Sequence, residues 1–310
     1  MKVIYGLHHI EKPVCGSVAT IGVFDGVHIG HKKIIDMAVS RARASGLKSI
    51  VLTFDPHPAK VLYPRPNVPS LISLDHRMRL IAERGVDISV VLKFTRHFSG
   101  LSPEKFLKDV LAGRLGVKYI YAGENFYFGK GAKAGTGKLK NMALSLGVKV
   151  IEVRPVMVMG RIASSSLARD LILKGDLAGA SRILGRPVSV LGTVVSGSRI
   201  ARALGYPTAN VNPHHEAVPP AGVYAVTVRL GRKTYRGVLN IGVRPTFYGS
   251  RDEETAIEAH IFGFTGNIYG RDLEISFVKK IRDELKFSDR GELMRRIRQD
   301  VTAAKKLLYK

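Results

Sequence analysis

The sequence predicts two domains, an α/β domain with a doubly wound parallel sheet and a small antiparallel β-barrel that ends in a helix. The chain has 310 residues, which exceeds the usual size of a single domain. Short apolar segments alternate with amphipathic segments up to about residue 155, and runs of β-branched residues follow from about residue 186. We place the boundary at Gly185-Arg186-Pro187, which predicts domains 1–185 and 186–310.

The first half alternates predicted strands with predicted helices. The strands are expected at Val18–Val23, Ser49–Phe54, Ile88–Leu92, Tyr119–Ala122 and Val148–Val153. The helices are expected at Lys32–Ser45, Asp75–Arg84 and Pro103–Leu115. Apolar strands alternating with helices are typical of a parallel sheet that is covered on both faces. Because such sheets bind ligands beyond the carboxyl ends of their strands, we expect a site in the loops after Val23, Phe54 and Ala122.

The second half contains short strand-like runs separated by turns. The predicted strands are Val188–Val194, Val223–Leu230, Thr234–Ile241, Ile257–Phe262 and Leu273–Phe277. Turns such as Leu230-Gly231-Arg232-Lys233 favour antiparallel pairing and a small barrel. The last segment, Arg290–Leu308, is amphipathic and predicts a terminal helix.

Composition narrows the class of protein. The single cysteine, Cys15, cannot form an internal disulfide, and no apolar run approaches the roughly 20 residues that span a membrane. We therefore expect a cytoplasmic protein with no membrane partner. A net charge of +24 attracts polyanions. Because the excess is spread over both halves without interleaved aromatic residues, we expect no specific nucleic-acid partner, although nucleic-acid binding stays the rival from another class.

Two histidines three residues apart, His28 and His31, follow the strand Val18–Val23 across a glycine-containing turn. They should share one face at the start of a helix, where free backbone N–H groups and the positive dipole end favour an anion. This arrangement suits a nucleotide phosphate. Metal ligation, which in zinc sites usually draws on further ligands, and an ordinary surface pair are the alternatives. The phosphate interpretation includes three more residues of this segment: Gly22, Phe24 and Gly30.

Two loops after later strands carry aromatic groups. The loop that contains Phe54 is fixed by prolines and predicts a wall for a ring or a phosphate, unless its polar residues are simple turn residues. The loop after Ala122 combines Asn125 with the rings of Phe126 and Phe128. Stacking rings and an amide suit a flat conjugated ligand, whereas the structural alternative is a loop that caps the core.

A run of serines, Ser164 to Ser166, precedes Arg169 at the expected start of another helix. Capping a helix needs one hydroxyl, so the additional serines favour contact with a phosphate. Arg161 and Arg169 would then neutralise the charge of a departing pyrophosphate.

These four motifs, in this order and spacing, resemble the FMN adenylyltransferase module of the bacterial bifunctional riboflavin kinase/FAD synthetases. The segment around His28 and His31 is by itself similar to the HxGH signature of nucleotidyltransferases. The resemblance implies that the FMN phosphate attacks ATP to give FAD and pyrophosphate, with both histidines acting on the phosphates. Where the family usually has threonine, this chain has Ser166, which keeps the hydroxyl. A nucleotidyltransferase with another acceptor would leave the second half unexplained.

The segments Leu204–Asn210, Gly237–Phe247, Ile257–Ile261 and Ile281–Phe287, with the helix after them, resemble the riboflavin kinase module of the same family. Thr208 and Asn210 lie two residues apart in an extended segment and so point the same way, and their oxygens suit Mg²⁺ at ATP. Glu258 by periodicity alone is an ordinary strand glutamate, but the family places its catalytic base there, to deprotonate the 5′-hydroxyl of riboflavin. The resemblance also implies ATP contacts for Gly197 and Arg202 and a flavin contact for Arg244.

Two departures from the family pattern lie near these residues. Ala201 replaces a glycine beside Arg202, and Asn267 replaces an acid. Neither removes a predicted kinase residue, so we predict an active kinase. The alternative is an FMN adenylyltransferase whose kinase module is weak or inactive. The implied partners are riboflavin, FMN and ATP, and weak self-association stays open.

Overall fold

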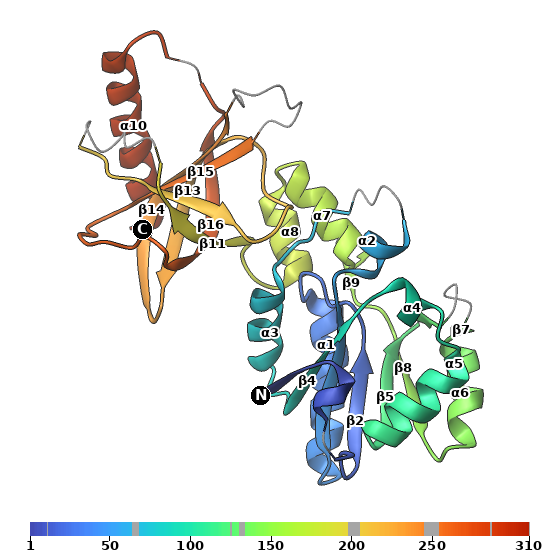
Figure 1. The fold of residues 1–310 in the computed structure, drawn as a ribbon. Coiled ribbons are helices and arrows are strands. Elements are labelled where there is room, and N and C mark those ends of the chain that lie inside the picture. Colours follow the sequence, from blue (N-terminus) through green and yellow to red (C-terminus); the bar gives the residue numbers. More distant parts are fainter. Residues whose placement is uncertain are drawn as a thin grey trace. The chain divides into compact units, whose positions relative to one another are not determined.

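The computed structural model describes residues 1–10, 12–63, 68–124, 126–129, 134–197, 205–244, 254–285 and 287–309. The chain divides into two compact units (Figure 1). The first comprises Met1–Ser70 and Leu74–Ser165, and the second comprises Leu71–Ser73 and Ser166–Lys310. The packing therefore divides near Ser165, so that α7 (Ser165–Leu173) and α8 (Leu177–Leu184) group with the barrel. The domain limits 1–185 and 186–310 stay a prediction about function.

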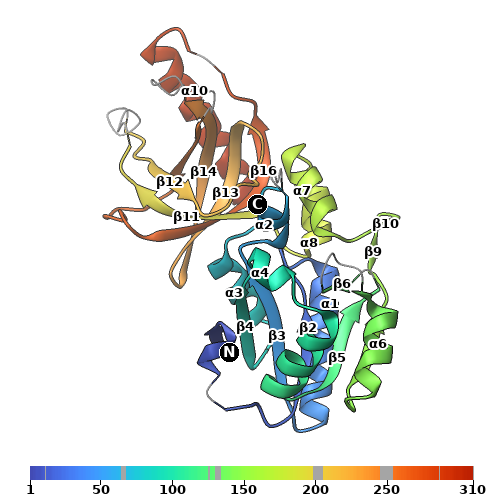
Figure 2. The ribbon, with the colours of Figure 1, turned by 45° about the vertical axis from the view of Figure 1, so that its right-hand side comes forward.

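The first unit contains a six-stranded sheet in the order β1-β4-β3-β2-β5-β8, and all of its neighbouring strands pair in parallel. The strands are β1 (Lys2–Tyr5), β2 (Ser17–Ile21), β3 (Lys48–Asp55), β4 (Ile88–Lys93), β5 (Val117–Gly123) and β8 (Lys149–Val153). The five predicted strands are confirmed, and the sequence did not reveal β1, a short edge strand with one buried residue. Figure 2 shows β4, β3, β2 and β5 side by side.

Helices cover both faces of this sheet, as the doubly wound prediction requires. Helix α1 (Ile29–Ala44) packs on β2, β3 and β5 through Ala38 and Ala42. The opposite face carries the π-helix η2 (Phe106–Arg114), which continues α5 (Pro103–Lys105), and α6 (Thr136–Leu144). The other helices described in this unit are η1 (Leu7–His9), α2 (Pro58–Leu62), α3 (Leu74–Ala82) and α4 (Arg96–Ser99). Two small ribbons pair β6 (Tyr127–Phe128) with β7 (Ala134–Gly135) and β9 (Met157–Val158) with β10 (Arg161–Ile162).

The strand order reverses at β2. From there the chain builds outward through β3 and β4 on one side and through β5 and β8 on the other. In parallel sheets such a reversal opens a crevice beyond the carboxyl ends of the two central strands. The loops after β2 and β5, which carry the histidine pair and Phe126, leave the sheet at this point.

The second unit is a closed antiparallel barrel in the order β11-β12-β15-β14-β13-β16. Its strands are β11 (Ser189–Val195), β12 (Ala209–Pro213), β13 (Gly222–Leu230), β14 (Lys233–Arg244), β15 (Glu254–Ile261) and β16 (Asp272–Arg282). The predicted barrel is thereby confirmed. The structure adds β12, which contains two asparagines and a proline and so has no strand pattern in the sequence. Helix α10 (Arg290–Leu308) is confirmed at both ends and packs Val301 and Ala304 against the barrel.

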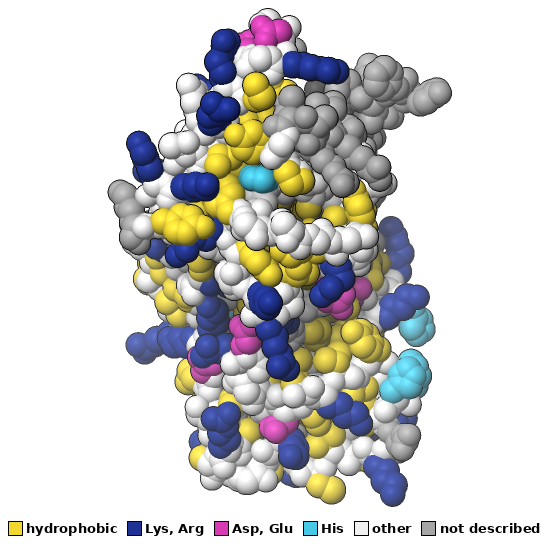
Figure 3. Space-filling model, turned by 90° about the vertical axis from the view of Figure 1, so that its left-hand side faces the viewer, with side chains coloured by type: hydrophobic (Ala, Val, Ile, Leu, Met, Phe, Trp, Pro, Cys, Tyr) yellow, Lys and Arg dark blue, Asp and Glu magenta, His cyan; other side chains and the backbone are white. Residues whose placement is uncertain are grey.

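No helix among the described residues has the length and apolar character needed to cross a membrane. On the face drawn in Figure 3, lysine and arginine side chains are spread over the surface and outnumber the acidic ones. This spread agrees with the interpretation of the positive charge as a general property of the surface.

Candidate active sites

His28 is the residue that begins helix α1. Its backbone is extended, and its ring Nδ1 accepts hydrogen bonds from the N–H groups of Gly30 (3.2 Å) and His31 (3.4 Å). An acceptor at Nδ1 leaves the proton of the neutral ring on Nε2, which is then a donor. A side-chain carbon on Gly30 would lie 3.0 Å from the His28 ring, so a larger residue here would press on this imidazole. The imidazole therefore accepts from two backbone N–H groups of the helix start, and its own Nε2–H remains as a donor.

The ring of His31 stacks on that of His28, with centroids 3.6 Å apart. Phe24 contacts the His31 ring edge-on at 5.1 Å. Burial, followed by the nearby His28 and Arg77, lowers the pKa of His31 well below its ordinary value. His31 is therefore neutral near pH 7, and a neutral imidazole carries one donor nitrogen and one acceptor nitrogen.

This depressed pKa predicts a loss of stability in acid. The unfolded chain takes up a proton at His31 near pH 6.5, whereas the folded imidazole resists it, so stability is complete above about pH 6.5 and falls below it. We expect the melting temperature to decrease between about pH 7.5 and about pH 5.5, and to decrease less in His31→Gln. Calorimetry over this range measures both slopes, and equal slopes would contradict the assignment.

The turn between β2 and α1 is held in an unusual conformation. Phe24 and Val27 have positive φ angles of 54° and 40°, although only glycine adopts this region freely. Both side chains are buried, at 2% and 0% exposure, and the Phe24 ring lies 3.2 Å from where a Cβ on Gly22 would be. Such residues cost about 1–3 kcal/mol each and persist only where their surroundings hold them. Backbone of this kind is concentrated at functional sites.

The serine motif reaches the same turn through Ser165. Its hydroxyl donates to the carbonyl oxygen of Asp25 at 2.8 Å, and Ser164 beside it is half-buried. The structure therefore joins the first and fourth motifs through Ser165. Arg161 is exposed on β10, and Arg169 lies on α7 in the second unit.

The predicted flavin residues of the first unit belong to a continuous series of phenylalanine rings. Successive ring centroids lie 5.7 to 6.3 Å apart. The rings are, in order, Phe54, Phe94, Phe98, Phe106, Phe128 and Phe126. The last two stack with an interplanar angle of 11°. The sequence did not identify Phe94, Phe98 and Phe106, which come from segments without a motif, and Asn125 lies outside the described residues.

The sequence also gave no signal for Arg77, a buried residue of α3. Its guanidinium bonds to the ends of β2 and β3, next to the histidine turn. A single arginine in an amphipathic helix has no pattern that separates it from a surface residue. Only the folded structure shows that this arginine faces inward.

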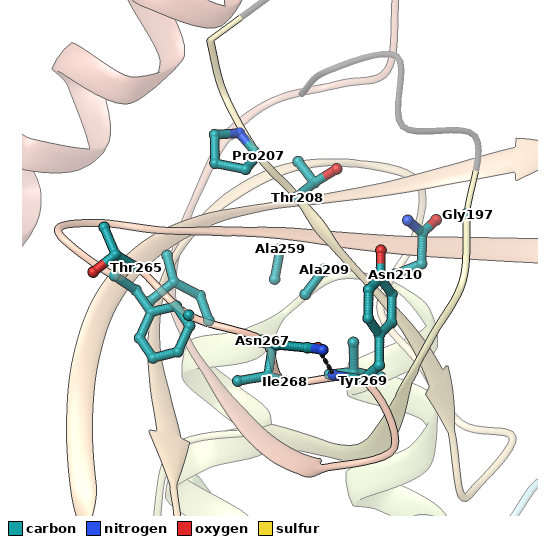
Figure 4. Close-up of a pocket in the computed structure, with 14 residues that line it drawn as sticks. Gly197, Pro207, Thr208, Ala209, Asn210, Ala259, Thr265, Asn267, Ile268 and Tyr269 are labelled. Carbon is teal, nitrogen blue, oxygen red and sulfur yellow. Dashed lines mark hydrogen bonds between the residues drawn. The ribbon is translucent and has the colours of Figure 1, made fainter. Parts of the chain in front are cut away.

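In the second unit, Thr208 and Asn210 line a cavity of about 680 Å³ (Figure 4). Gly197 lies against Asn210, since a Cβ at this glycine would be 2.1 Å from the amide nitrogen of Asn210. The loop that contains Asn267 forms another wall, where its side-chain oxygen accepts from the N–H of Tyr269 at 3.0 Å. The asparagine thus stabilises its own turn. Arg202 lies outside the described residues.

Glu258 lines a second cavity, of about 390 Å³, and Thr208 lines both cavities. On the barrel wall Glu258 pairs in register with Asn210 of β12 on one side and with Asn240 of β14 on the other. The predicted base and the predicted metal ligand are therefore neighbours on adjacent strands. The apolar part of this second cavity is formed by Val223, Val238, Leu285, Phe287, Leu293 and Ile297.

Two further polar contacts shape the second cavity. Arg282 of β16 forms an ion pair with Asp300 of α10, at 3.0 Å from Nε to Oδ1 and 2.7 Å from Nη2 to Oδ2. His260 Nδ1 lies 2.8 Å from the carbonyl oxygen of Pro207, the residue before Thr208. Both contacts fix walls of the cavity, and no sequence pattern indicated either of them. The side chain of Arg244 lies outside the described residues.

Comparisons with known proteins agree with both halves. Residues 10–167 match the FAD synthetase family, and residues 184–308 match the riboflavin kinase family. The bifunctional riboflavin kinase/FMN adenylyltransferase of Bacillus subtilis (strain 168) is 37% identical over 297 residues, which cover 94% of this chain and 93% of that protein. The protein of the same description from Escherichia coli (strain K12) is 34% identical over 307 residues, covering 98% and 97%.

A solved structure shares the fold over nearly the full length. It is a protein from Streptococcus pneumoniae whose title describes a macrolide-efflux protein, and it superposes with a TM-score of 0.85 at 31% identity, covering 97% of each chain. This similarity supports the architecture of both units. Since both family matches and the full-length relatives agree, the chain belongs to the family of bifunctional riboflavin kinases/FMN adenylyltransferases.

Proposed function

We propose that the barrel phosphorylates riboflavin to FMN and that the N-terminal unit adenylylates FMN to FAD. The family supplies the two activities, and the placement of the motif residues supports their division between the units. The observation on which the kinase assignment rests most is that Glu258 lies beside Asn210 while Thr208 lines both cavities. One substrate in each cavity would bring the two reacting groups together at Thr208.

In the barrel, we assign the larger cavity to ATP and the smaller one to riboflavin. The Glu258 carboxylate takes the proton of the ribityl 5′-hydroxyl as this oxygen attacks the γ-phosphorus of ATP, and ADP leaves. The hydroxyl of Thr208 and the amide oxygen of Asn210 are hard donors of the kind that fits Mg²⁺. When bound, Mg²⁺ supplies positive charge that offsets the charge on the phosphate oxygens. Gly197 allows close approach to Asn210 and so fixes the orientation of its amide.

Changing the amide ligand should change the demand for the metal ion. In Asn210→Ala we expect half-maximal FMN formation to need about 10- to 100-fold more Mg²⁺, the loss typical of a disturbed metal site. The measurement is a Mg²⁺ titration of FMN formation at a fixed ATP concentration. The Mg²⁺ dependence of FAD formation from supplied FMN is the control in the same protein. An unchanged titration of FMN formation would exclude Asn210 as a ligand.

In the first unit, an oxygen of the FMN phosphate attacks the α-phosphorus of ATP and pyrophosphate leaves. FMN is itself the nucleophile, so no covalent intermediate with the protein is needed. We assign His28 and His31 to the ATP phosphates as neutral donors, with Nε2–H of His28 directed by the contacts at its Nδ1. Gly22, Phe24 and Gly30 shape the turn that holds both rings.

The phenylalanine series supports a flavin site in the first unit. Most of these rings meet edge-on or tilted, but the series ends in two half-buried rings, Phe54 and Phe126, which form an apolar wall for the isoalloxazine ring. We assign Phe54, Phe126 and Phe128 to that wall together with Asn125, and we keep Arg244 as a flavin residue of the barrel.

Because the lone cysteine is unpaired, we also propose a cytoplasmic location, where ATP and flavins are available.

Product analysis tests the proposal directly. Purified protein with riboflavin, ATP and Mg²⁺ should give FMN first and FAD later, and protein with FMN and ATP should give FAD and pyrophosphate. Chromatography of the flavins follows both steps. Formation of FAD from FMN without any FMN from riboflavin would favour a chain whose kinase module is inactive.

A further inference from the structure

The guanidinium of Arg77 is buried between two loops that leave the parallel sheet. The residue has 5% exposure, and its Nη1 donates to the carbonyl oxygen of Val23 (2.7 Å), the hydroxyl of Thr53 (3.1 Å) and the carbonyl oxygen of Phe54 (3.0 Å). Nη2 lies 3.7 Å from a carboxylate oxygen of Asp55. Taking a charge out of water is costly unless partners compensate it. Here several acceptors converge on one planar cation.

These contacts connect the segments that follow β2 and β3 at the point where the backbone pairing of the two strands ends. The N–H of Gly22 still donates to the carbonyl oxygen of Leu52 at 3.1 Å. One residue further on, side chains make the connection. The Thr53 hydroxyl donates to the carbonyl oxygen of Val23 at 3.0 Å, and Arg77 donates to both residues. The planar guanidinium suits this task, since it presents several donors in fixed directions.

The two loops that Arg77 joins carry the two parts of the first site. Val23 directly precedes Phe24, where the left-handed turn that leads to His28 begins. Phe54 is the first ring of the phenylalanine series. An arginine that fixes Val23 relative to Phe54 therefore fixes the phosphate donors relative to the flavin wall.

We infer that Arg77 is a positioning residue for adenylyl transfer, which keeps the histidine turn and the flavin wall in their mutual geometry. The inference rests on the proposed function of the first unit. Burial lowers the pKa of Arg77, and the carboxylates of Asp25 and Asp55 oppose that shift. These carboxylates keep the cation paired within the site. Arg77 itself bonds to backbone and side chains of the loops and acts on the reaction through them.

The test is Arg77→Met, which keeps the length of the side chain and removes its donors. We expect kcat for FAD formation from FMN to fall roughly 100-fold, the loss that follows when reacting groups are displaced by about 1 Å. The KM values for FMN and ATP should change by less than about threefold, because the groups that bind them remain. FMN formation by the barrel should be unchanged, which makes the second activity an internal control for folding and concentration.

Two more variants separate positioning from general stability. Unlike Arg77→Met, Arg77→Lys keeps the positive charge, but it lacks the planar set of guanidinium donors. We therefore expect its kcat to lie between those of the wild type and Arg77→Met. Arg84→Met is the control, because the Nε of Arg84 donates to Asp36 of α1 at 2.7 Å, away from the two loops. It should lower the melting temperature without lowering kcat. In NMR spectra, the ring signals of His28 and His31 should shift in Arg77→Met and stay in place in Arg84→Met.

Wild-type kcat in Arg77→Met would overturn the inference. So would a loss of kcat that Arg84→Met reproduces, or one that disappears on cooling as the folded fraction rises. His28→Ala in the same assay tests the proposed function separately. If His28→Ala retains FAD formation, the assignment of the site is wrong, whereas an inactive His28→Ala beside a fully active Arg77→Met contradicts only the role of Arg77.

Discussion

Glu258→Gln is expected to lower kcat for riboflavin phosphorylation by about 10²- to 10⁴-fold, the contribution typical of a general base. The amide keeps the size of the side chain and its place between Asn210 and Asn240, but it does not accept the hydroxyl proton. Binding contacts of riboflavin in the second cavity remain, so the KM for riboflavin should change little. Initial rates of FMN formation measure both constants.

The control for this variant is Glu274→Gln. Glu274 lies on β16 of the same barrel, where it accepts from Arg229 Nε at 2.8 Å. It belongs to neither cavity lining, so FMN formation should keep its wild-type kcat. FAD formation from supplied FMN should be normal in both variants. A Glu258→Gln protein that phosphorylates riboflavin at the wild-type rate would exclude Glu258 as the base.

His28→Ala and His31→Ala should each lower kcat for FAD formation by roughly 10²- to 10³-fold, the cost of removing one donor from a developing phosphate charge. FMN formation by the barrel should remain, because the two units are separately packed. The pair should show non-additive losses, since the rings stack on each other and one ring orients the other. Rates of FAD and pyrophosphate release measure the effect.

A second substitution separates the two tasks of His28. His28→Asn supplies a side-chain oxygen that caps a helix well, while it removes the imidazole donor. If the loss in His28→Ala came only from the cap, His28→Asn would recover activity. We expect it to recover stability and not activity. His9→Ala, at an exposed histidine of η1, is the control and should leave both reactions unchanged.

The sequence predicted those parts of the fold that rest on local pattern. Buried strands such as β4 are nearly continuous apolar runs, and α10 has an amphipathic period with a capping aspartate at Asp289. The four residues of β1 are too few to show a period, and β12 contains two asparagines and a proline, so pairing with neighbouring strands determines both. No sequence pattern indicated the order of the strands in the sheet or in the barrel, although this order decides which loops lie next to one another.

The same distinction, between local sequence pattern and contacts across the fold, applies to the residues of the candidate sites. Residues within a motif, such as His28 and Thr208, could be named because their spacing already fixes a shared face or a shared loop. Arg77, Phe94 and His260 could not, since each acts on a loop that is distant in sequence. Their roles arise from contacts across the fold, and single-sequence patterns carry no information about such contacts.

The position of Thr208 between the two barrel cavities has a consequence for the binding of ligands. Thr208 borders both barrel cavities, so a ligand that moves this side chain from one cavity would also change the wall of the other. Reciprocity then requires that each ligand alter the dissociation constant of the other by one and the same factor. Titration of each ligand in the presence and absence of the other measures this factor.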